Sequence, residues 1–404
     1  MKIMVINSGS SSIKYQIFDM RDRSALASGL LEKIGETDSR LTHQTRVPNS
    51  RFEAIEKTTA VADHAAGFDL INTVLKDTGA LANMAELAGI GHRVVHGGEA
   101  FKQPTLIDDT VIATIRELIP LAPLHNPANL VGIEVARGAA PEVPQVAVFD
   151  TAFHQSIPPH AFHYALPRAL YTEDRVRRYG FHGTSHAYVA EKAARFLAQP
   201  LESLNLITLH LGNGASVSAV EGGRSIDTSM GLTPLEGLIM GTRCGDIDPA
   251  IIFYLARETG RSIEAIDQLL NKDSGLKGLC GVNDMREITR LAREDDADAR
   301  LAIDMVCYRI RKYIGAYYAA LGRLDALVFT GGVGENAIDI REGACRALQP
   351  MGIDLDADRN ADPSRKARAI HSDQSGVKIL VIPTNEELKI ADETRLLLIQ
   401  PETA

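Results

Sequence analysis

Two short turns of small polar residues carry groups that could bind a polyphosphate. The first lies in VINSGSSSIKYQIFD, where Ser10, Ser12 and Lys14 fall between and after apolar, strand-like residues. Turns made of Gly, Ser and Asn can direct several backbone N–H groups into one concavity, and a lysine adds a point charge for phosphate. An ordinary hairpin favours the same residue types. The rest of the chain has to decide between the two interpretations.

A second turn repeats the pattern of the first. It is the segment HLGNGAS, residues 210–216, which follows the apolar run LIT and precedes VSAV. A third glycine cluster, TGGVGEN at 330–336, lies between a strand-like and a helix-like segment. Neither the Walker A pattern nor a complete GxGxxG is present. We therefore expect phosphate binding by two related turns, with the third cluster near the nucleotide, and not by a P-loop.

Three cationic or titratable residues lie in glycine-rich loops. They are Arg93 in HRVVHGGE, His182 in RYGFHGTSH and Arg243 in GTRCGDIDP. A guanidinium in such a loop suits a carboxylate or a phosphate. Each residue taken alone is more often structural, but three of them beside phosphate turns favour an anion-binding site. A metal site on His182 and His186 is disfavoured, because that spacing needs a helix and Gly183 resists one.

The segment TNEEL supplies a carboxylate for a metal ion. Thr384 and Glu387 have the spacing of a capping box, which assigns Glu387 to the start of a helix. Glu386 is then free to bind Mg²⁺, directly or through water. The alternative is that Glu386 only stabilises the positive end of the helix dipole.

The elements that would position these residues alternate between strand-like and helix-like runs, which predicts βαβ units and a largely parallel sheet. In NPANLVGIEVARG, Asn126 is expected to cap a helix that Gly138 ends. The segments MVINSGSSSIKYQIF and ITLHLGNGASVSAV share one pattern, which indicates an internal duplication. Two related domains with a cleft between their turns are the expected architecture.

Composition excludes several classes of protein. A chain of 404 residues with 45% hydrophobic and 24% charged residues is typical of a globular protein of two or three domains. Its net charge of −9 argues against nucleic acid or an anionic membrane as partner. The four cysteines have no CxxC spacing, and no apolar run approaches the roughly 20 residues of a membrane span. We expect a cytoplasmic protein.

Nine motifs together resemble the acetate kinase family. In chain order they are VINSGSSSIKYQIFD, GHRVVHGGE, LAPLHNP, FDTAFH, RYGFHGTSH, HLGNGAS, MGTRCGDIDP, TGGVGEN and PTNEE. The resemblance implies an α/β fold of two duplicated ribonuclease-H-like, actin-like ATPase domains around a nucleotide cleft. It implies that residues 1–150 with 386–404 form the N-terminal domain and that 151–385 form the second, nucleotide-binding domain. It also implies a homodimer.

The resemblance assigns roles position by position. Asn7 and Glu386 would hold Mg²⁺, for which Mn²⁺ could substitute. The residues implied at the nucleotide are Ser10, Ser12, Lys14, His210, Leu211, Gly212, Asn213, Gly214, Asp284, Met285, Arg286, Gly332, Val333, Gly334, Glu335 and Asn336. The residues implied at the acid are Arg93, Val95, Leu124, Phe181 and Pro234. The residues implied in catalysis are Arg93, Asp150, His182 and Arg243. Met285 departs from the aromatic residue that can occur there, which leaves the choice between ATP and GTP open.

The implied reaction is direct in-line transfer from ATP to acetate, giving acetyl phosphate and ADP. A carboxylic acid with a pKa near that of glutamate, about 4.3, is ionised at pH 7 and needs no general base. Asp150 is therefore expected to orient Arg93 or Arg243, or to hold a Mg²⁺-bound water, and not to abstract a proton. Arginines, Lys14 and Mg²⁺ would neutralise the repulsion between the acid and the polyphosphate.

Three other functions are alternatives to phosphoryl transfer to acetate. Propionate or butyrate could be the acid, since one methylene changes binding by only about 1–3 kcal/mol, although Val95 favours acetate. A serine hydrolase would use Ser185 in GTSHA as its nucleophile, but that segment lacks the last glycine of the elbow. An ATP-driven binding or filament protein would keep the nucleotide turns but has no use for Arg93 beside an apolar pocket.

Overall fold

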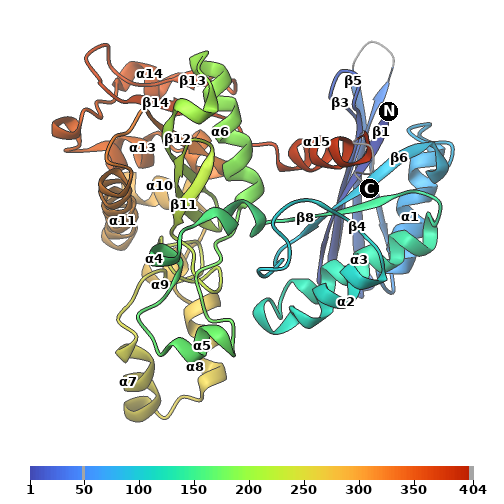
Figure 1. Ribbon diagram of the computed structural model, residues 1–404, viewed down its shortest axis with the longest axis horizontal. Helices are drawn as coiled ribbons and strands as arrows, with labels where there is room; N and C mark the ends of the chain where they lie inside the picture. The colour runs from blue at the N-terminus through green and yellow to red at the C-terminus, as the bar shows by residue number, and fades with distance from the viewer. Residues whose placement is uncertain (48–50, 400–404) are drawn as a thin grey trace. The chain divides into compact units, whose positions relative to one another are not determined.

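The computed structural model describes residues 1–47 and 51–399. It divides into two compact units, the described parts of 1–152 with 385–404 and residues 153–384. Each unit is built on one β-sheet with helices packed against it (Figure 1). The α/β class predicted from the sequence is confirmed.

The first unit contains an eight-stranded sheet. Its strands are β1 (Lys2–Gly9), β2 (Ser12–Asp19), β3 (Ser24–Glu32), β4 (Ser39–Val47), β5 (Arg51–Thr59), β6 (Leu87–Val94), β7 (Thr105–Leu106) and β8 (Gln145–Phe149). Their order across the sheet is β5-β4-β3-β2-β1-β6-β8-β7. Only β1, β6 and β8 run parallel to one another, and the other pairs are antiparallel. The prediction of a largely parallel sheet is therefore wrong, because hairpins extend the sheet on one side of β1.

The second unit contains a six-stranded sheet. Its strands are β9 (Asn205–Leu211), β10 (Ala215–Glu221), β11 (Arg224–Thr228), β12 (Ala326–Thr330), β13 (Arg368–Ala369) and β14 (Lys378–Val381). Their order is β11-β10-β9-β12-β14-β13, with β9, β12 and β14 parallel. The pairs β9–β10, β10–β11 and β13–β14 are antiparallel.

The two sheets are copies of one topology. The strands β3-β2-β1-β6-β8-β7 of the first unit correspond to β11-β10-β9-β12-β14-β13 of the second, in chain order, spatial order and direction. The first sheet differs by the added edge strands β4 and β5. The duplication inferred from two sequence segments therefore extends to six strands in each unit.

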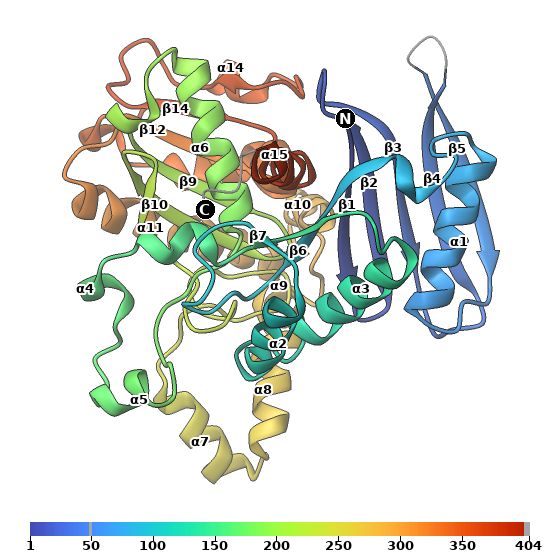
Figure 2. The same ribbon diagram turned by 45° about the vertical axis from the view of Figure 1, so that its right-hand side comes forward.

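Helices cover both faces of the first sheet. They are α1 (His64–Asp77), α2 (Asp109–Glu117), α3 (Asn126–Ala139) and α15 (Glu386–Ile399). Figure 2 shows α1 and α3 on one face, where they enclose a core that includes Ile13, Phe68 and Ile71. On the other face α15 packs against β1, β6 and β8 around Val5 and Ile390.

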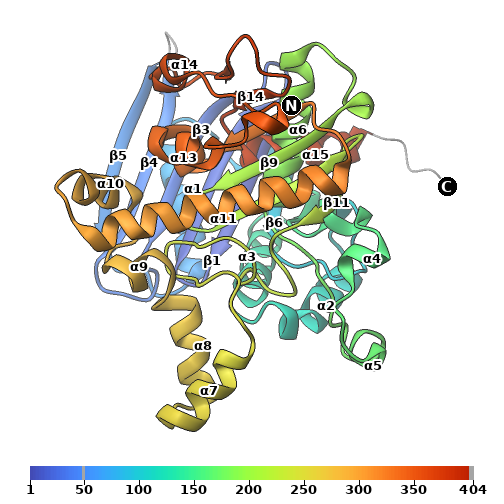
Figure 3. The same cartoon turned by 90° about the vertical axis from the view of Figure 1, so that its left-hand side faces the viewer.

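The second unit is richer in helices. They are α4 (Pro159–Phe162), α5 (Arg168–Thr172), α6 (Gly183–Leu197), α7 (Ala250–Thr259), α8 (Ile263–Lys272), α9 (Gly275–Cys280), α10 (Met285–Arg293), α11 (Ala297–Leu321), α12 (Gly331–Asn336), α13 (Ile338–Cys345) and α14 (Ala357–Ala361). The long helix α11 lies across the sheet and contacts β9 and β10 (Figure 3). Helix α6 packs against β9 and β12.

The last helix of each repeat packs on the sheet of the other repeat. Helix α6 follows β8 in the chain but packs on the second sheet, and α15 follows β14 but packs on the first. Each unit therefore takes one of its helices from the other half of the sequence. This exchange explains why residues after 385 belong to the first unit.

Local helix signals were less accurate than the order of the elements. Asn126 lies inside α3 after the cap residue His125, and Gly138 lies inside the helix and does not end it. Gly183 does not resist a helix, because α6 begins at this residue. Asn126 instead uses its amide to bond the backbone of His96, at 3.1 Å for each of two bonds.

None of the helices in the described ranges combines the length and the apolar character that crossing a bilayer requires.

We predict that Gly91→Ala destabilises the first unit by about 1–3 kcal/mol. A Cβ at Gly91 would lie 2.7 Å from Cγ2 of Ile390 and closer still to Thr394, both on α15. Gly138 in α3 is the matched control, because nothing lies within 4 Å of a Cβ there and an alanine should stabilise by at most about 1 kcal/mol. Urea unfolding of both variants measures the difference, and equal effects would contradict this packing of α15.

Candidate functional site

Three parallel strands bring the polar residues of the first unit to one edge of its sheet. Asn7 lies near the end of β1, Arg93 near the end of β6, and Asp150 directly after β8. The backbone N–H of Asp150 donates to the carbonyl of Val94 at 2.9 Å, which continues the β6–β8 ladder to these residues. The register of the sheet therefore positions this group.

Arg93 and Asp150 form a buried ion pair. Arg93 Nη2 donates to Oδ2 of Asp150 at 2.7 Å, and Nε donates to the same carboxylate at 3.1 and 3.2 Å. The Asp150 side chain is 1% exposed and that of Arg93 is 24% exposed. The charge of Asp150 raises the pKa of Arg93 further above its ordinary value. Arg93 is thus held as a fixed cation with part of its side chain accessible.

Glu386, the first residue of α15, lies near this ion pair. Burial raises the pKa of its carboxyl to about 7, and the nearby Asp150 and Glu387 also raise it, while Arg93 and Lys14 act in the opposite direction. The structure therefore brings together Glu386, Arg93 and Asp150. A buried carboxylate among other carboxylates is a group that a bound cation would stabilise.

The assignment of Glu387 to a capping box is wrong. Asn385 caps α15 instead, because its side-chain oxygen accepts from the N–H of Leu388 at 2.9 Å. Glu387 pairs with Lys14 of β2, and Thr384 bonds to Ser185 at 2.8 Å. The spacing within TNEEL could not show that Glu387 forms an ion pair with a lysine that is far away in the sequence.

A metal ion would have few protein ligands here. No group of three or more His, Cys, Asp or Glu side chains gathers as a metal cage in residues 1–47 and 51–399. Mg²⁺ at nucleotide sites is usually bound through one or two carboxylates with waters and substrate phosphates. The half-buried side chains of Asn7 and Glu386 would supply oxygen ligands of this kind.

The first turn is a tight hairpin. Strand β1 continues through Gly9 and β2 starts at Ser12, so only Ser10 and Ser11 lie outside the ladder. The interruption of the strand is shorter than its composition suggested. The carbonyl of Gly9 is bonded by Nε2 of His64 at 2.8 Å, and Ser10 is exposed at the tip.

Asn129 is a residue of this region that the sequence analysis missed. Its Nδ2 donates to the carbonyl of Ser8 at 2.9 Å, and its Oδ1 accepts from the N–H of Val95 at 3.0 Å. It thus joins the ends of β1 and β6 from helix α3. The sequence pattern that could have identified it is the pair Asn126 and Asn129. These two residues are three apart, so they share one face of a helix whose neighbouring residues are apolar.

In the second unit, His182 and His210 form a stacked pair. Their ring centroids are 4.3 Å apart with an interplanar angle of 25°. His182 is in the left-handed region at φ 56° and precedes α6, while His210 lies near the end of β9. Nδ1 of His182 bonds Ser216 at 2.9 Å, and Nδ1 of His210 bonds Ser185 at 2.7 Å.

Arg243 lies close to this pair. A Cβ on Gly214 would be 3.4 Å from Nε2 of His182 and 3.6 Å from Nη1 of Arg243, so the glycine leaves room between the two side chains. Nη1 of Arg243 donates to the carbonyl of Pro234 at 3.0 Å. Within the part of the chain that the structure describes, no carboxylate pairs with Arg243, and burial lowers its pKa. A desolvated guanidinium of this kind favours an anion.

A cavity of about 880 Å³ lies beside the second turn. Residues from three of the four segments predicted at the nucleotide line it, namely Gly212, Asn213, Asp284, Met285, Arg286, Gly332, Val333 and Asn336. The cavity also has lining residues that the sequence analysis did not identify, including Thr289, Arg293, Ile338 and Arg365. Arg286 pairs with Asp284 at 2.6 Å, and Arg293 pairs with Asp339 at 3.1 Å. The cavity is large enough for a nucleotide.

Other residues implied at the nucleotide have different surroundings. Gly334 and Glu335 do not line the cavity, and Glu335 accepts from the N–H of Gly331 at 3.0 Å and of Thr384 at 3.1 Å. Its carboxylate therefore fixes the start of α12 against the end of β14. Leu211 lines a small apolar crevice that also contains Met285.

The four residues implied in the apolar pocket are distributed over both units. Val95 is buried after β6, whereas Leu124 is 64% exposed before α3. In the second unit Phe181 is buried, and its carbonyl bonds Nε2 of His154 at 3.0 Å. Pro234 contributes its carbonyl to Arg243.

Ser185 does not have the geometry of a hydrolase nucleophile. It lies inside α6 and is 0% exposed, and its Oγ is bonded to both His210 and Thr384. A nucleophile elbow would present this oxygen at the surface of a strand-to-helix turn. The hydrolase alternative is therefore not supported.

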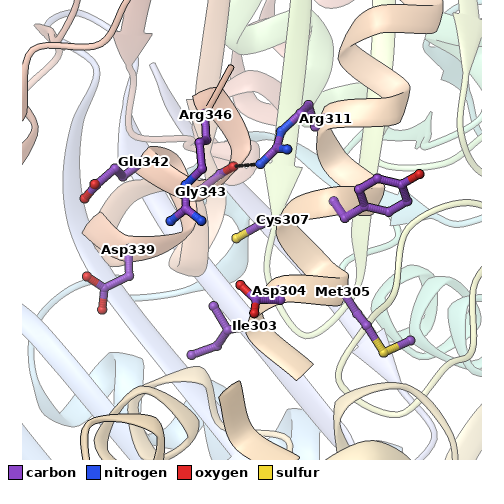
Figure 4. A pocket seen from close by; sticks show the side chains of 10 residues that line it. Ile303, Asp304, Met305, Cys307, Arg311, Asp339, Glu342, Gly343 and Arg346 are labelled. Carbon is purple, nitrogen blue, oxygen red and sulfur yellow. Dashed lines mark hydrogen bonds between the residues drawn. The ribbon is translucent and has the colours of Figure 1, made fainter. Parts of the chain in front are cut away.

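A second cavity, of about 670 Å³, lies between α11 and α13 (Figure 4). Arg311 from α11 crosses to α13, where its Nη2 donates to the carbonyl of Gly343 at 2.6 Å. Asp339 lines both this cavity and the one beside the second turn. None of the residues predicted for the site lines the second cavity.

Comparison with known proteins identifies the family. A profile of the acetokinase family matches residues 2–392. An acetate kinase of Syntrophobacter fumaroxidans is 57% identical over 395 residues, 98% of this chain and 96% of that protein. The crystal structure of Porphyromonas gingivalis acetate kinase has a TM-score of 0.92 at 44% identity, covering 98% and 99% of the chains. A propionate kinase from Francisella tularensis has a TM-score of 0.91 at 43% identity, with the same coverage. The resemblance carried by nine motifs is confirmed, and the chain belongs to the acetokinase family.

Proposed function

We propose that the protein transfers the γ-phosphoryl group of ATP to acetate, forming acetyl phosphate and ADP in a reversible reaction. The observation that carries the proposal is the 57% identity to an acetate kinase over nearly the whole chain. The site supports it chemically, because it contains a fixed cation, a desolvated guanidinium and a cavity of nucleotide size.

In this proposal Arg93 binds the carboxylate of acetate. Asp150 holds the guanidinium through Nε and Nη2, which leaves the two N–H groups of Nη1 and one of Nη2 as donors for the acid. Asp150 thereby orients Arg93 and does not act as a base, since acetate is already ionised at neutral pH. Val95, Leu124, Phe181 and Pro234 are the proposed walls for the methyl group.

The second unit is proposed to bind the nucleotide and stabilise the transferring group. The 880 Å³ cavity would take the nucleoside and its first phosphates, with Ser10, Ser12 and Lys14 of the first turn at the terminal phosphates. His182 and Arg243 would contact the phosphoryl group in transit. Because phosphoryl transfer passes through a loose transition state, positioning and charge provide most of the catalysis.

Mg²⁺ is the proposed cofactor, with Mn²⁺ as a substitute, and Asn7 and Glu386 would hold it. When bound, the ion would neutralise phosphate charge and orient the terminal phosphates. Glu386 suits this role because desolvation raises the pKa of its carboxyl, so that a bound cation would stabilise the ionised form. We place the enzyme in the cytoplasm, where ATP is available and where its four free cysteines would remain reduced.

Propionate is the alternative acid, favoured by the likeness to a propionate kinase structure. We predict that Mg-ATP turnover with hydroxylamine as trap ranks acetate above propionate and butyrate, because buried Val95 limits the pocket. ADP release and acyl hydroxamate are measured for each acid and without acid. A higher kcat/KM for propionate would reassign the substrate, and turnover without acid would favour the ATP-driven binding protein.

Substitutions of the two arginines are predicted to change different kinetic constants. Arg93→Gln is made together with Asp150→Asn, so that no unpaired buried charge remains. This variant should raise the KM for acetate at least tenfold while retaining ATP binding. Arg243→Ala should lower kcat by about 10³-fold with a smaller change in KM, as expected for a cation that acts in the transition state.

Steady-state kinetics and nucleotide binding by calorimetry separate these two effects. Arg261→Ala is the control, since Arg261 is exposed in the same unit as Arg243 and should leave both constants unchanged. If Arg243→Ala raised only the KM for acetate, its proposed place beside the phosphoryl group would be wrong.

We propose a homodimer that uses the apolar face of α7. This helix has no buried residue, although Phe253 is 60% and Tyr254 57% exposed, and Ile251 accompanies them. Phe253→Asp should convert the dimer to a monomer in sedimentation velocity, because a charge there cannot be buried. Phe52→Asp on edge strand β5, where Phe52 is 48% exposed, should leave the mass unchanged. A dimer that survives Phe253→Asp would rule out this face.

A further inference from the structure

A chain of buried hydroxyl and imidazole groups lies behind His182. Ser216 Oγ is 2.9 Å from Nδ1 of His182 and 2.8 Å from Nε2 of His186. Nδ1 of His186 is 2.7 Å from Oγ1 of Thr208. We call the three groups behind His182 the hydroxyl relay (Thr208, His186, Ser216). All three residues are 0% exposed.

Three arrangements of protons supply one hydrogen to each bond of the hydroxyl relay when both imidazoles are neutral. In the first, Thr208 donates to His186, His186 donates from Nε2 to Ser216, and Ser216 donates to His182. In the second, every one of these bonds is reversed. In the third, only the last bond is reversed, so that Ser216 accepts from both histidines. The first leaves the proton of His182 on Nε2, and the other two leave it on Nδ1.

The hydroxyl hydrogens of Thr208 and Ser216 decide between these arrangements. In the first arrangement both are bonded, to Nδ1 of His186 and to Nδ1 of His182. In the second the hydrogen of Thr208 needs another acceptor, and in the third the hydrogen of Ser216 does, and the described residues provide none for either hydroxyl. A buried donor without a partner costs about 1–3 kcal/mol, so the first arrangement is favoured roughly 5- to 150-fold.

These arrangements require a neutral His186, and the surroundings of the ring oppose a positive charge on it. The side chain is fully buried, and burial lowers its pKa well below the ordinary value of 6.5. The neighbouring rings are His154, at a centroid distance of 5.7 Å, and His210, at 6.4 Å, and both oppose a positive charge on His186. His186 therefore stays neutral and can accept at one nitrogen and donate at the other.

We propose that the hydroxyl relay holds His182 as the neutral tautomer with its proton on Nε2, aimed as a hydrogen-bond donor at the transferring phosphoryl group. Nε2 is the ring nitrogen near Gly214 and Nη1 of Arg243, so both donors face the same small space. The inference rests on the proposed kinase function for its consequence, but the tautomer itself does not depend on that function. Thr208, His186 and Ser216 are positioning residues, since they act only through His182.

The first test is the tautomer, read by long-range ¹H–¹⁵N NMR of histidine-labelled protein, with His182 assigned by its loss in His182→Gln. The wild-type protein should show His182 protonated on Nε2 at neutral pH. Ser216→Ala should give a mixture of tautomers, because the hydroxyl that donates to Nδ1 is removed. Ser225→Ala is the matched control, since it removes the hydroxyl that bonds His154 at 2.8 Å, another buried Ser–His pair. A wild-type His182 protonated on Nδ1, or a Ser216→Ala variant that keeps one tautomer, would overturn the proposal.

The second test separates the hydroxyl of Thr208 from its packing. Thr208→Val keeps the shape and removes the hydroxyl, whereas Thr208→Ser keeps the hydroxyl and removes a methyl. The proposal expects Thr208→Val to lower kcat about tenfold with each KM changed by less than about twofold, and Thr208→Ser to remain near wild type. A packing role predicts the reverse order and would contradict the proposal.

The two tests can fail separately. If the wild-type protein lacks acid-dependent turnover, the proposed function is wrong while the NMR result still decides the tautomer. If turnover is normal and His182 carries its proton on Nδ1, the relay is wrong while the function stands.

Discussion

The site depends on the parallel alignment of three strands in each sheet. Strands β1, β6 and β8 end at one edge of the sheet. Their alignment brings the polar residues Asn7, Arg93 and Asp150 to that edge. The duplicated sheet repeats it with β9, β12 and β14, after which come the second turn, the glycine cluster and Thr384. Open α/β sheets bind ligands at the carboxyl ends of their strands for this reason. The ladder therefore fixes these groups more rigidly than long loops would.

The two arginines proposed to bind the substrates are in opposite electrostatic environments. Arg93 is paired with Asp150 and keeps a fixed orientation. This environment suits a substrate that must be oriented by the arginine but bound with only modest affinity. Arg243 is half-buried, and within the described residues its side chain bonds the carbonyl of Pro234 and the thioether of Met240 but no carboxylate. A charge without a counterion destabilises the free protein, and binding of a group with high opposite charge stabilises it most. A transferring phosphoryl group carries such a charge, whereas an acid with one negative charge does not.

The sequence predicted the fold and many of the candidate site residues because their signals are local. The turns at residues 7–14 and 210–216, the third glycine cluster and the duplication are readable from short patterns. The sequence analysis missed Asn129, Arg365 and the pairing of Lys14 with Glu387, because these depend on contacts between segments more than 25 residues apart or on an unpatterned loop. The capping box failed for the same reason. Spacing suggested Thr384 as a partner for the helix, but tertiary contacts occupy Thr384 and leave the cap to Asn385.

The groups bonded to Nδ1 of the two histidines fit the proposed chemistry. A catalytic histidine that accepts a proton usually has a carboxylate on its second nitrogen, which stabilises the imidazolium. Nδ1 of His182 instead meets the hydroxyl of Ser216, and Nδ1 of His210 meets that of Ser185. A hydroxyl orients an imidazole without supplying a negative charge, so it favours a neutral ring that donates or accepts one bond. This agrees with a reaction whose acid is ionised before it binds, since such a reaction needs donors for developing phosphoryl charge and no general base.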